Sequence, residues 1–178
     1  NADSMQVYEG LQVLTARPSP SEEDIVPHQL YGHVPATTRY SVGSWLRDVK
    51  TLLPTIEKAG QTPIFVGGTG LYFKALTEGL AELPEFTPEQ FNDFIGNLEA
   101  LSTHALQERL READPISFER IECGDRQRTL RALMVLELTG QSLSQWQQQA
   151  QSKALFPLNS SVPIVLMPQN RNWLYSRI

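Results

Sequence analysis

The chain has 178 residues, 40% of them hydrophobic and 20% charged, which fits one globular domain with room for a small appendage. Its formal net charge of −5 argues against a nonspecific nucleic-acid binder driven by bulk charge, but it allows a local basic patch that reads one structured RNA. The sequence holds no run of about 18 apolar residues and no signal-peptide pattern. With one cysteine, Cys123, we expect a cytoplasmic protein with neither a membrane span nor a disulfide framework.

The first predicted elements are loops followed by one long helix. Residues 18–40 are rich in prolines and turn formers and are expected to be loops. Residues 41–59 carry apolar side chains at intervals of three and four, which predicts an amphipathic helix. Ser41 is its expected N-cap and Gly60 its expected stop. Pro54 lies inside this pattern and is expected to kink the helix or end it early.

A glycine turn follows the first strand signal. The apolar run 62–66 predicts a strand, residues 67–70 a glycine turn, and residues 71–76 the start of a helix. In an open parallel sheet such turns lie at the carboxyl edge, where substrates bind. Glycine lets the backbone approach a ligand, and a helix start offers free N–H groups to an anion. Thr69 could bond a substrate or cap the helix, and the residues alone favour neither.

A helical block interrupts this α/β pattern. Three helices are predicted in a row, at residues 86–99, 104–112 and 125–139. Asp125 is the expected N-cap of the third helix and Gly140 its stop, and Ser142 with Gln145 forms a capping box for a further short helix. Strand signal returns at residues 162–167. We therefore predict an α/β core over residues 1–84, a helical insertion over residues 85–158, and a return to the core over residues 159–178.

Two groups of residues are candidates for chemistry. Asp3 stands in what reads as a loop after a strand and is placed to accept a proton in a cleft, although a capping aspartate is the simpler interpretation of this residue by itself. Arg128 and Arg131 share one helix face near its N-terminal half, where the helix dipole disfavours cations, which suggests an external anion such as a phosphate. A solvated face paired with Asp125 or Glu122 explains these arginines equally well. The sequence shows no metal-ligand spacing and no nucleophile elbow.

Six ordered segments, spread over essentially the whole chain, resemble the tRNA dimethylallyltransferase family. They are residues 1–8, 15–18, 26–28, 40–41, 66–72 with 74–76, and 125–133 with 139–140. Their order and compatible spacing make the resemblance far more specific than any single motif.

The resemblance implies a fold, a reaction and a set of site residues. The implied fold is an α/β P-loop-type parallel sheet with a helical insertion. The implied reaction moves a dimethylallyl group from its diphosphate to N6 of an adenosine beside the tRNA anticodon. The implied partners are the anticodon stem-loop and dimethylallyl diphosphate, with Mg²⁺ as cofactor and a monomeric enzyme. Asp3 matches the general base, and the positions that match tRNA contacts are Asp3, Ser4, Met5, Gln6, Thr69, Gln127, Arg128, Thr129, Leu130 and Arg131.

The family's phosphate loop and its C-terminal part are missing from this chain, which contains no Gly-x-x-x-x-Gly-Lys-Ser/Thr pattern. We therefore expect these 178 residues alone to be inactive and most Mg²⁺ ligands to lie outside them. The alternatives are an adenylate isopentenyltransferase that acts on free nucleotide, a small-molecule P-loop kinase of similar core, and a non-catalytic RNA-binding module.

Overall fold

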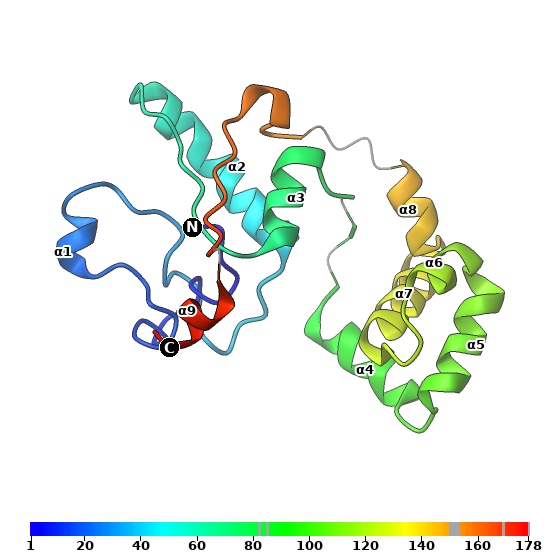
Figure 1. Cartoon of the computed structure of the whole chain (residues 1–178). Coiled ribbons are helices and arrows are strands. Elements are labelled where there is room, and N and C mark those ends of the chain that lie inside the picture. The colour runs from blue at the N-terminus through cyan, green and yellow to red at the C-terminus, as the bar shows by residue number, and fades with distance from the viewer. Residues whose placement is uncertain (82, 85, 150–153, 169, 178) are drawn as a thin grey trace.

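The structure is a computed structural model that describes residues 1–81, 83–84, 86–149, 154–168 and 170–177. In this part of the chain the helical elements are α1 (Pro20–Glu23), α2 (Val42–Lys58), α3 (Gly70–Glu78), α4 (Pro88–Leu98), α5 (Thr103–Ala113), α6 (Pro115–Arg120), α7 (Arg126–Thr139), α8 (Leu143–Gln149), the 3-10 turn η1 (Leu158–Ser160) and α9 (Arg171–Tyr175). Figure 1 shows two lobes. We call residues 1–81 with 154–161 the N-terminal lobe and residues 86–149 the helical lobe.

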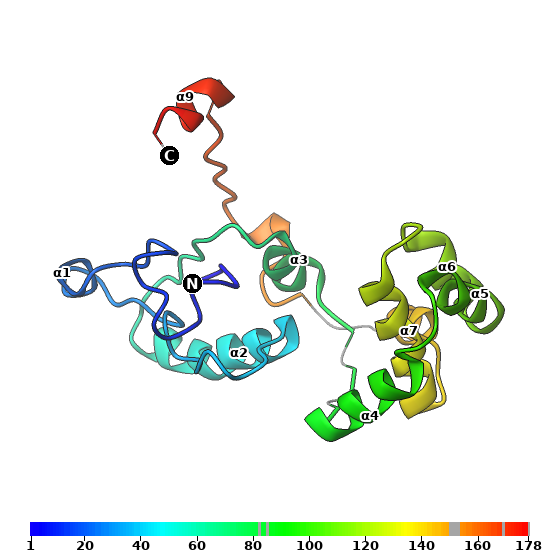
Figure 2. The same ribbon diagram turned by 90° about the horizontal axis from the view of Figure 1, so that it is seen from below.

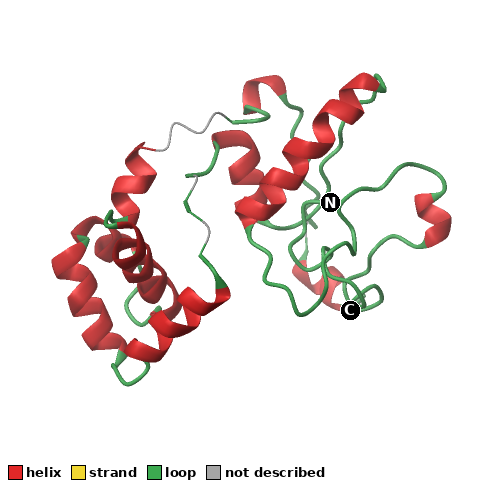
Figure 3. Ribbon diagram, turned by 180° about the vertical axis from the view of Figure 1, so that it is seen from behind, coloured by secondary structure: helices red, strands yellow, loops and turns green. Residues whose placement is uncertain are grey.

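The predicted parallel-sheet core of an α/β, P-loop-type fold is wrong for the described residues, which contain one isolated parallel bridge, between Tyr8 and Val34, and no strand (Figure 3). The predicted strand at residues 62–66 has its backbone bonded to another segment only where Ala2 N donates to Val66 O at 2.7 Å. The segment at residues 162–167 leads away from both lobes toward α9 (Figure 2). Its apolar side chains are exposed on both faces. An apolar alternation specifies a strand only when a neighbouring strand supplies the ladder, and none of the described segments does so.

The helix predictions fared better. The predicted helices at residues 41–59, 86–99, 104–112 and 125–139 are confirmed as α2, α4, α5 and α7, with ends shifted by one or two residues. Ser41 caps α2 by accepting from Ser44 N at 3.1 Å, and Gly60 follows the helix with a φ of +65°. The proline inside α2, Pro54, does not end it early, because the helix continues to Lys58. A single missing donor is tolerated when the apolar face of a helix is packed.

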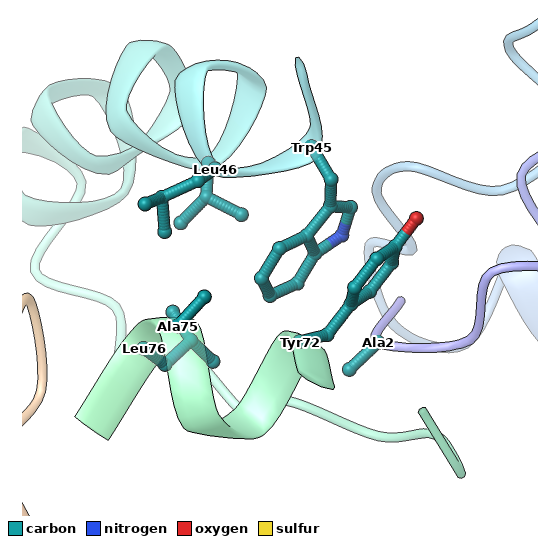
Figure 4. Close-up of a cluster of buried hydrophobic side chains, with 7 residues drawn as sticks. Ala2, Trp45, Leu46, Tyr72, Ala75 and Leu76 are labelled. Carbon is teal, nitrogen blue, oxygen red and sulfur yellow. The ribbon is translucent and has the colours of Figure 1, made fainter. Parts of the chain in front are cut away.

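The N-terminal lobe is centred on an aromatic pair from α2 and α3. Trp45 is completely buried and stacks on Tyr72, with ring centroids 4.3 Å apart and an angle of 18° between the rings. Figure 4 shows this pair between the two helices, with Ala2 of the N-terminal segment against the Tyr72 side. The indole Nε1 of Trp45 donates to the carbonyl of Asn1 at 2.9 Å. Helix α2 therefore holds the N-terminal segment through both packing and a hydrogen bond.

The helical lobe has its own hydrophobic cluster. Helix α5 packs against α6 and α7, and its Leu106 and Leu110 are completely buried with Met134 and Val135 of α7. Burying an aliphatic side chain of this size contributes about 1.5–3 kcal/mol. The helices α4 to α7 each begin at a capping side chain, from Thr87, Ser102, Asp114 and Asp125 in turn. The capping box predicted for Ser142 and Gln145 is also present, with bonds of 2.9 and 3.2 Å.

One buried carboxylate joins two helices of the helical lobe. Asp114 is 2% exposed and caps α6 by accepting from Ser117 N at 3.2 Å. The same side chain accepts from Ser144 N at 3.1 Å and from Ser144 Oγ at 2.6 Å, at the start of α8. Burial alone would raise the pKa of Asp114, but the hydrogen bonds from Ser117 and Ser144 outweigh burial and lower it. Asp114 therefore fixes α8 against α6 as an ionised group.

The two lobes meet through a cation–π contact. The guanidinium carbon of Arg39, in the loop before α2, lies 3.9 Å from the ring centroid of Phe91 in α4. The chain then returns to the N-terminal lobe, where Phe156 N donates to Leu76 O at 3.0 Å and the Phe156 ring lies 5.1 Å from that of Phe65.

Candidate functional site

The glycine turn after residues 62–66 lies directly against the N-terminal segment. A Cβ atom added to Gly67 would lie 2.2 Å from the carbonyl carbon of Ala2 and 2.6 Å from the backbone N of Asp3. No side chain fits there, because those atoms belong to backbone. Thr69 N also donates to Ala2 O at 3.2 Å. Close backbone contact thus places Asp3 beside the turn at residues 67–70.

Thr69 ties the two segments together with its side chain. Its Oγ1 accepts from Ser4 N at 2.9 Å and donates to Ser4 Oγ at 3.2 Å. The hydroxyl does not cap α3, although Thr69 occupies the N-cap position of that helix. The side chain therefore positions the Ser4 backbone, and the contact with tRNA expected for it stays a prediction.

The two carboxylate oxygens of Asp3 have different surroundings. Oδ1 accepts from Met5 N at 2.8 Å and from Gln6 N at 3.4 Å, which is the capping geometry expected of a loop aspartate. Oδ2 faces Gly68, at 3.6 Å from where a Cβ of that glycine would stand. No hydrogen bond reaches Oδ2 from the residues that the structure describes. One oxygen thus fixes the side chain while the other is free to accept a proton.

The charge of Asp3 acts on two tyrosine hydroxyls. Burial and, to a smaller extent, the charge of Asp3 raise the pKa of Tyr31. Burial, with smaller effects of Tyr8 and Asp3, raises the pKa of Tyr72 to about 12. Sequence reasoning did not include Tyr31 or Tyr72 in the site. For Tyr72 a signal was present, since it lies one helical turn after Thr69 and so faces the same end of α3.

The other N-terminal candidates differ in their availability. The Met5 side chain is 52% exposed beside Asp3. The Gln6 side chain is committed, because its Nε2 donates to the carbonyls of Thr15 at 2.8 Å and Ala16 at 3.3 Å. Met5 is thus the member of this group whose side chain is open to a ligand.

The predicted α7 segment has an inward and an outward face. Thr129 is completely buried and donates to Asp125 O at 2.7 Å, and Leu130 packs against the lobe's cluster. Gln127, Arg128 and Arg131 are exposed. Any direct contact with a ligand therefore falls to these three outward side chains.

Each arginine of this segment has a protein contact. Arg128 Nη1 lies 3.0 Å from Asp125 Oδ2, an exposed pair of the kind expected for a solvated face. Arg131 lies over the Phe86 ring, at 5.1 Å from its centroid. Arg126 donates to the carbonyls of Leu98, Glu99 and Leu101 at the end of α4, with distances of 2.6–3.3 Å. Arg126 is therefore structural, while Arg128 and Arg131 present charge at the surface.

The structure brings Asp3, Ser4 and Thr69 together but not the α7 residues. No hydrogen bond, ion pair or ring contact of the described residues joins the Asp3 region to residues 127–131, and Figure 1 shows α7 in the other lobe. The described residues contain no group of three His, Cys, Asp or Glu side chains able to hold a metal ion. The Mg²⁺ that the resemblance implies, with most of its ligands outside these residues, stays a prediction. No helix among them is long and apolar enough to cross a membrane.

A family model described as IPP transferase matches residues 6–178. The chain belongs to the IPP transferase family. This confirms the resemblance found in the sequence. The curated tRNA dimethylallyltransferases of Jannaschia sp. (strain CCS1) and Chelativorans sp. (strain BNC1) are 47% and 49% identical to it over 178 residues. Each match covers 100% of this chain but 58% and 60% of the relative, so the chain spans under two thirds of their length.

Among solved structures, the chain is similar to a crystallographically studied eukaryotic dimethylallyltransferase acting on tRNA. The two share 24% sequence identity and a TM-score of 0.68, over 85% of this chain and 38% of the other. At this identity the likeness shows a shared fold.

Proposed function

We propose that the protein, as a cytoplasmic monomer, transfers a dimethylallyl group from dimethylallyl diphosphate to N6 of an adenosine beside the tRNA anticodon. The observation that carries the proposal is the free Oδ2 of Asp3, held at the glycine turn of Gly68 by the bonds that Oδ1 makes. The two relatives named tRNA dimethylallyltransferase, at 47% and 49% identity over the whole chain, support the same reaction.

The chemistry requires a carboxylate in this setting. The N6 amine is a weak nucleophile because its lone pair is delocalised into the purine ring. As N6 bonds to C1 of the dimethylallyl group, the C1–O bond breaks and the diphosphate leaves with the electron pair. Positive charge develops on nitrogen, and Asp3 Oδ2 stabilises it and accepts the N6 proton. An oxygen with no internal hydrogen bond keeps its full acceptor capacity for this step.

Access to Asp3 requires that the adenine leave its stack, which costs a few kcal/mol. The exposed Arg128 and Arg131 on α7 would offset part of this cost by binding the phosphates of the anticodon stem-loop. The Arg128–Asp125 pair has 70% of the Arg128 side chain exposed and is weak enough to exchange for a phosphate. An exposed pair of cations of this kind supports a macromolecular acceptor over a free nucleotide.

The test replaces Asp3 with asparagine in the protein at the full length of its reading frame. The asparagine side chain would keep an oxygen for Met5 N and Gln6 N, so D3N preserves the turn and removes only the base. We expect kcat for an anticodon stem-loop to fall by about 10²–10⁴ with RNA binding unchanged. The matched control is Asp24→Asn, an exposed aspartate at the end of α1.

Full activity of D3N would refute the role of Asp3 as the base. Absence of transfer by the wild-type protein, with the RNA still bound, would refute the proposed reaction and leave the non-catalytic RNA-binding module. The free-nucleotide alternative is tested by competition between AMP and the stem-loop for labelled dimethylallyl diphosphate. Transfer to AMP in preference to the stem-loop would identify an adenylate isopentenyltransferase.

A further inference from the structure

Tyr72 has a hydroxyl group that the protein itself does not use. The residue is 3% exposed, and its ring is fixed by the stack on Trp45. Buried tyrosines usually place the hydroxyl on a hydrogen-bond partner. No hydrogen bond reaches the Tyr72 hydroxyl from the described residues, yet no fully enclosed polar side-chain atom among them lacks a partner. The hydroxyl is therefore the part of this side chain that opens to the surface.

The hydroxyl opens on the side of the N-terminal segment. Figure 4 shows it at the end of the ring farthest from α3, beyond the edge of the Trp45 indole, with Ala2 beside the ring. Trp45 in turn donates to Asn1 O at 2.9 Å, so the stacked pair is bonded to the residues that precede Asp3. At the other end of the residue, Tyr72 N donates to Thr69 O at 2.9 Å. The Tyr72 ring is thus fixed from both sides against the segment that carries Asp3.

The electrostatic surroundings of the hydroxyl keep it protonated. Burial is the largest cause of the rise of the Tyr72 pKa to about 12, and the neighbouring Tyr8 and Asp3 raise it further. A hydroxyl in this state is a neutral donor at any physiological pH. The carboxylate of Asp3 is an acceptor. The charge of Asp3 acts on the hydroxyl, and neither Asp3 Oδ2 nor the hydroxyl is bonded to a described residue, so the site presents one donor and one acceptor.

We propose that Tyr72 binds the adenine by donating its hydroxyl hydrogen to ring nitrogen N1 of the purine whose N6 amine is bound by Asp3. This inference rests on the proposed function. The amine of adenine is a donor and the adjacent N1 is an acceptor, which matches an acceptor from Asp3 and a donor from Tyr72. Guanine presents the oxygen acceptor O6 to the Asp3 carboxylate, which is a mismatch, and its N1–H would require the Tyr72 hydroxyl to turn and accept. Flipped bases are commonly read in this way, along the Watson–Crick edge.

The experiment combines Tyr72→Phe in the protein at full length with stem-loops that carry adenosine or 1-deaza-adenosine at the target. The deaza base has a C–H group in place of N1. We expect Y72F to lower kcat/KM for the adenosine RNA by about three- to tenfold, the effect of one neutral hydrogen bond. The deaza base should lower the wild-type value, and Y72F should add nothing to that loss. Multiplicative losses in the four-way cycle would overturn the proposal.

Two further measurements separate this role from a structural one. The midpoint of urea unfolding should not change in Y72F, since the hydroxyl has no partner among the described residues and the ring stack is kept. A fall in that midpoint which accounts for the lost activity would overturn the proposal. Tyr31→Phe is the matched control, because it removes a hydroxyl near Asp3 from a less buried ring. Coupling of N1 to Tyr31 in place of Tyr72 would also overturn it.

The D3N variant distinguishes the inference from the function beneath it. If D3N is inactive on both RNAs while Y72F behaves as wild type, the inference fails and the proposed function stands. If the wild-type protein transfers nothing to either RNA, the proposed function fails whatever Y72F does, and if D3N is fully active, only the role of Asp3 fails.

Discussion

In the helical lobe, the caps of α4, α5, α6 and α7 each bond a backbone N–H three residues away. In the N-terminal lobe, the bonds that build the site join residues 65 positions apart at Ser4–Thr69 and 44 positions apart at Trp45–Asn1. The first lobe is therefore specified mainly by local sequence, while the second depends on distant segments that meet at the right place. Distant contacts carry a larger entropic cost before they form. We expect the two lobes to respond differently to the same kind of damage.

The largest effect is expected from Asp114→Ala, because Asp114 bonds both its own helix start and Ser144, 30 positions away. The substitution removes the acceptor of three buried donors, which are Ser117 N, Ser144 N and Ser144 Oγ. We expect a loss of about 3 kcal/mol in the free energy of unfolding of this lobe. Segment-resolved hydrogen exchange should show lost protection in α5 to α8 and unchanged protection in α2 and α3. Asp93→Ala, an exposed aspartate in α4, is the control; equal effects of the two variants would contradict the assignment.

A smaller effect, about 2 kcal/mol, is expected in the N-terminal lobe from Gly67→Ala. The new methyl group would meet the backbone of Ala2 and Asp3, which cannot turn aside as a side chain does. Protection should fall in α3 and in the N-terminal segment, with the helical lobe unchanged. Gly70→Ala is the control, since nothing lies within 4 Å of a Cβ at Gly70. If both variants keep wild-type protection, the close approach at Gly67 does not exist in solution.

The pH dependence of stability should also differ between the lobes. The hydrogen bonds of Asp114 lower its pKa below that of the unfolded chain, which is about 3.9. Its contribution is therefore present above that value and is lost as the pH falls through about 4 toward the folded-state pKa. We expect hydrogen exchange in α6 and α8 to accelerate over this range beyond its intrinsic pH dependence. Asp114→Asn should remove the step, and a step that persists in this variant would assign it to another group.

The smallest effect on stability is expected at the segment at residues 162–167. Ile164 and Leu166 are 81% and 93% exposed, so Ile164→Lys and Leu166→Lys remove no packing and should change the unfolding midpoint very little. They should nevertheless slow aggregation, because an exposed extended apolar segment is a template for pairing between chains. Light scattering at rising concentration measures this. A large loss of stability would show that the segment is packed in solution.

The sequence predicted the helical lobe, which is built by local contacts, better than the N-terminal lobe, which is built by distant ones. Asp125, Gly140 and the Ser142–Gln145 box marked real helix ends, because caps act within a few residues. Helix α6 was missed although Asp114 and Pro115 form an N-cap and a first-turn proline that could have revealed it. The sheet was wrong because the strand pattern at residues 62–66 states what a segment prefers, not whether a partner strand lies beside it.

The candidate site was foreseen only in part. The turn at residues 67–70 and Asp3 were each identified from the sequence, and the structure places them together. What the sequence could not reveal is how each side chain is occupied. In the sequence, Gln6 and Thr129 look as available for ligand binding as Met5 and Arg128. In the structure, the polar groups of Gln6 and Thr129 are engaged in internal hydrogen bonds. Tyr72 was not predicted as a site residue, because an aromatic residue at helical spacing is expected to be buried in the hydrophobic core.

Arg126, the guanidinium bound to three carbonyls at the end of α4, bears on how ionic strength would act on this protein. Each cation that neutralises a nucleic-acid phosphate releases about one counterion, so the salt slope of binding counts cations in contact. Arg126 is engaged within the polypeptide and would release none. Replacing Arg126 would unravel a helix end and leave the salt slope unchanged. Replacing Arg128 or Arg131 would reduce the magnitude of the salt slope by about one in each case.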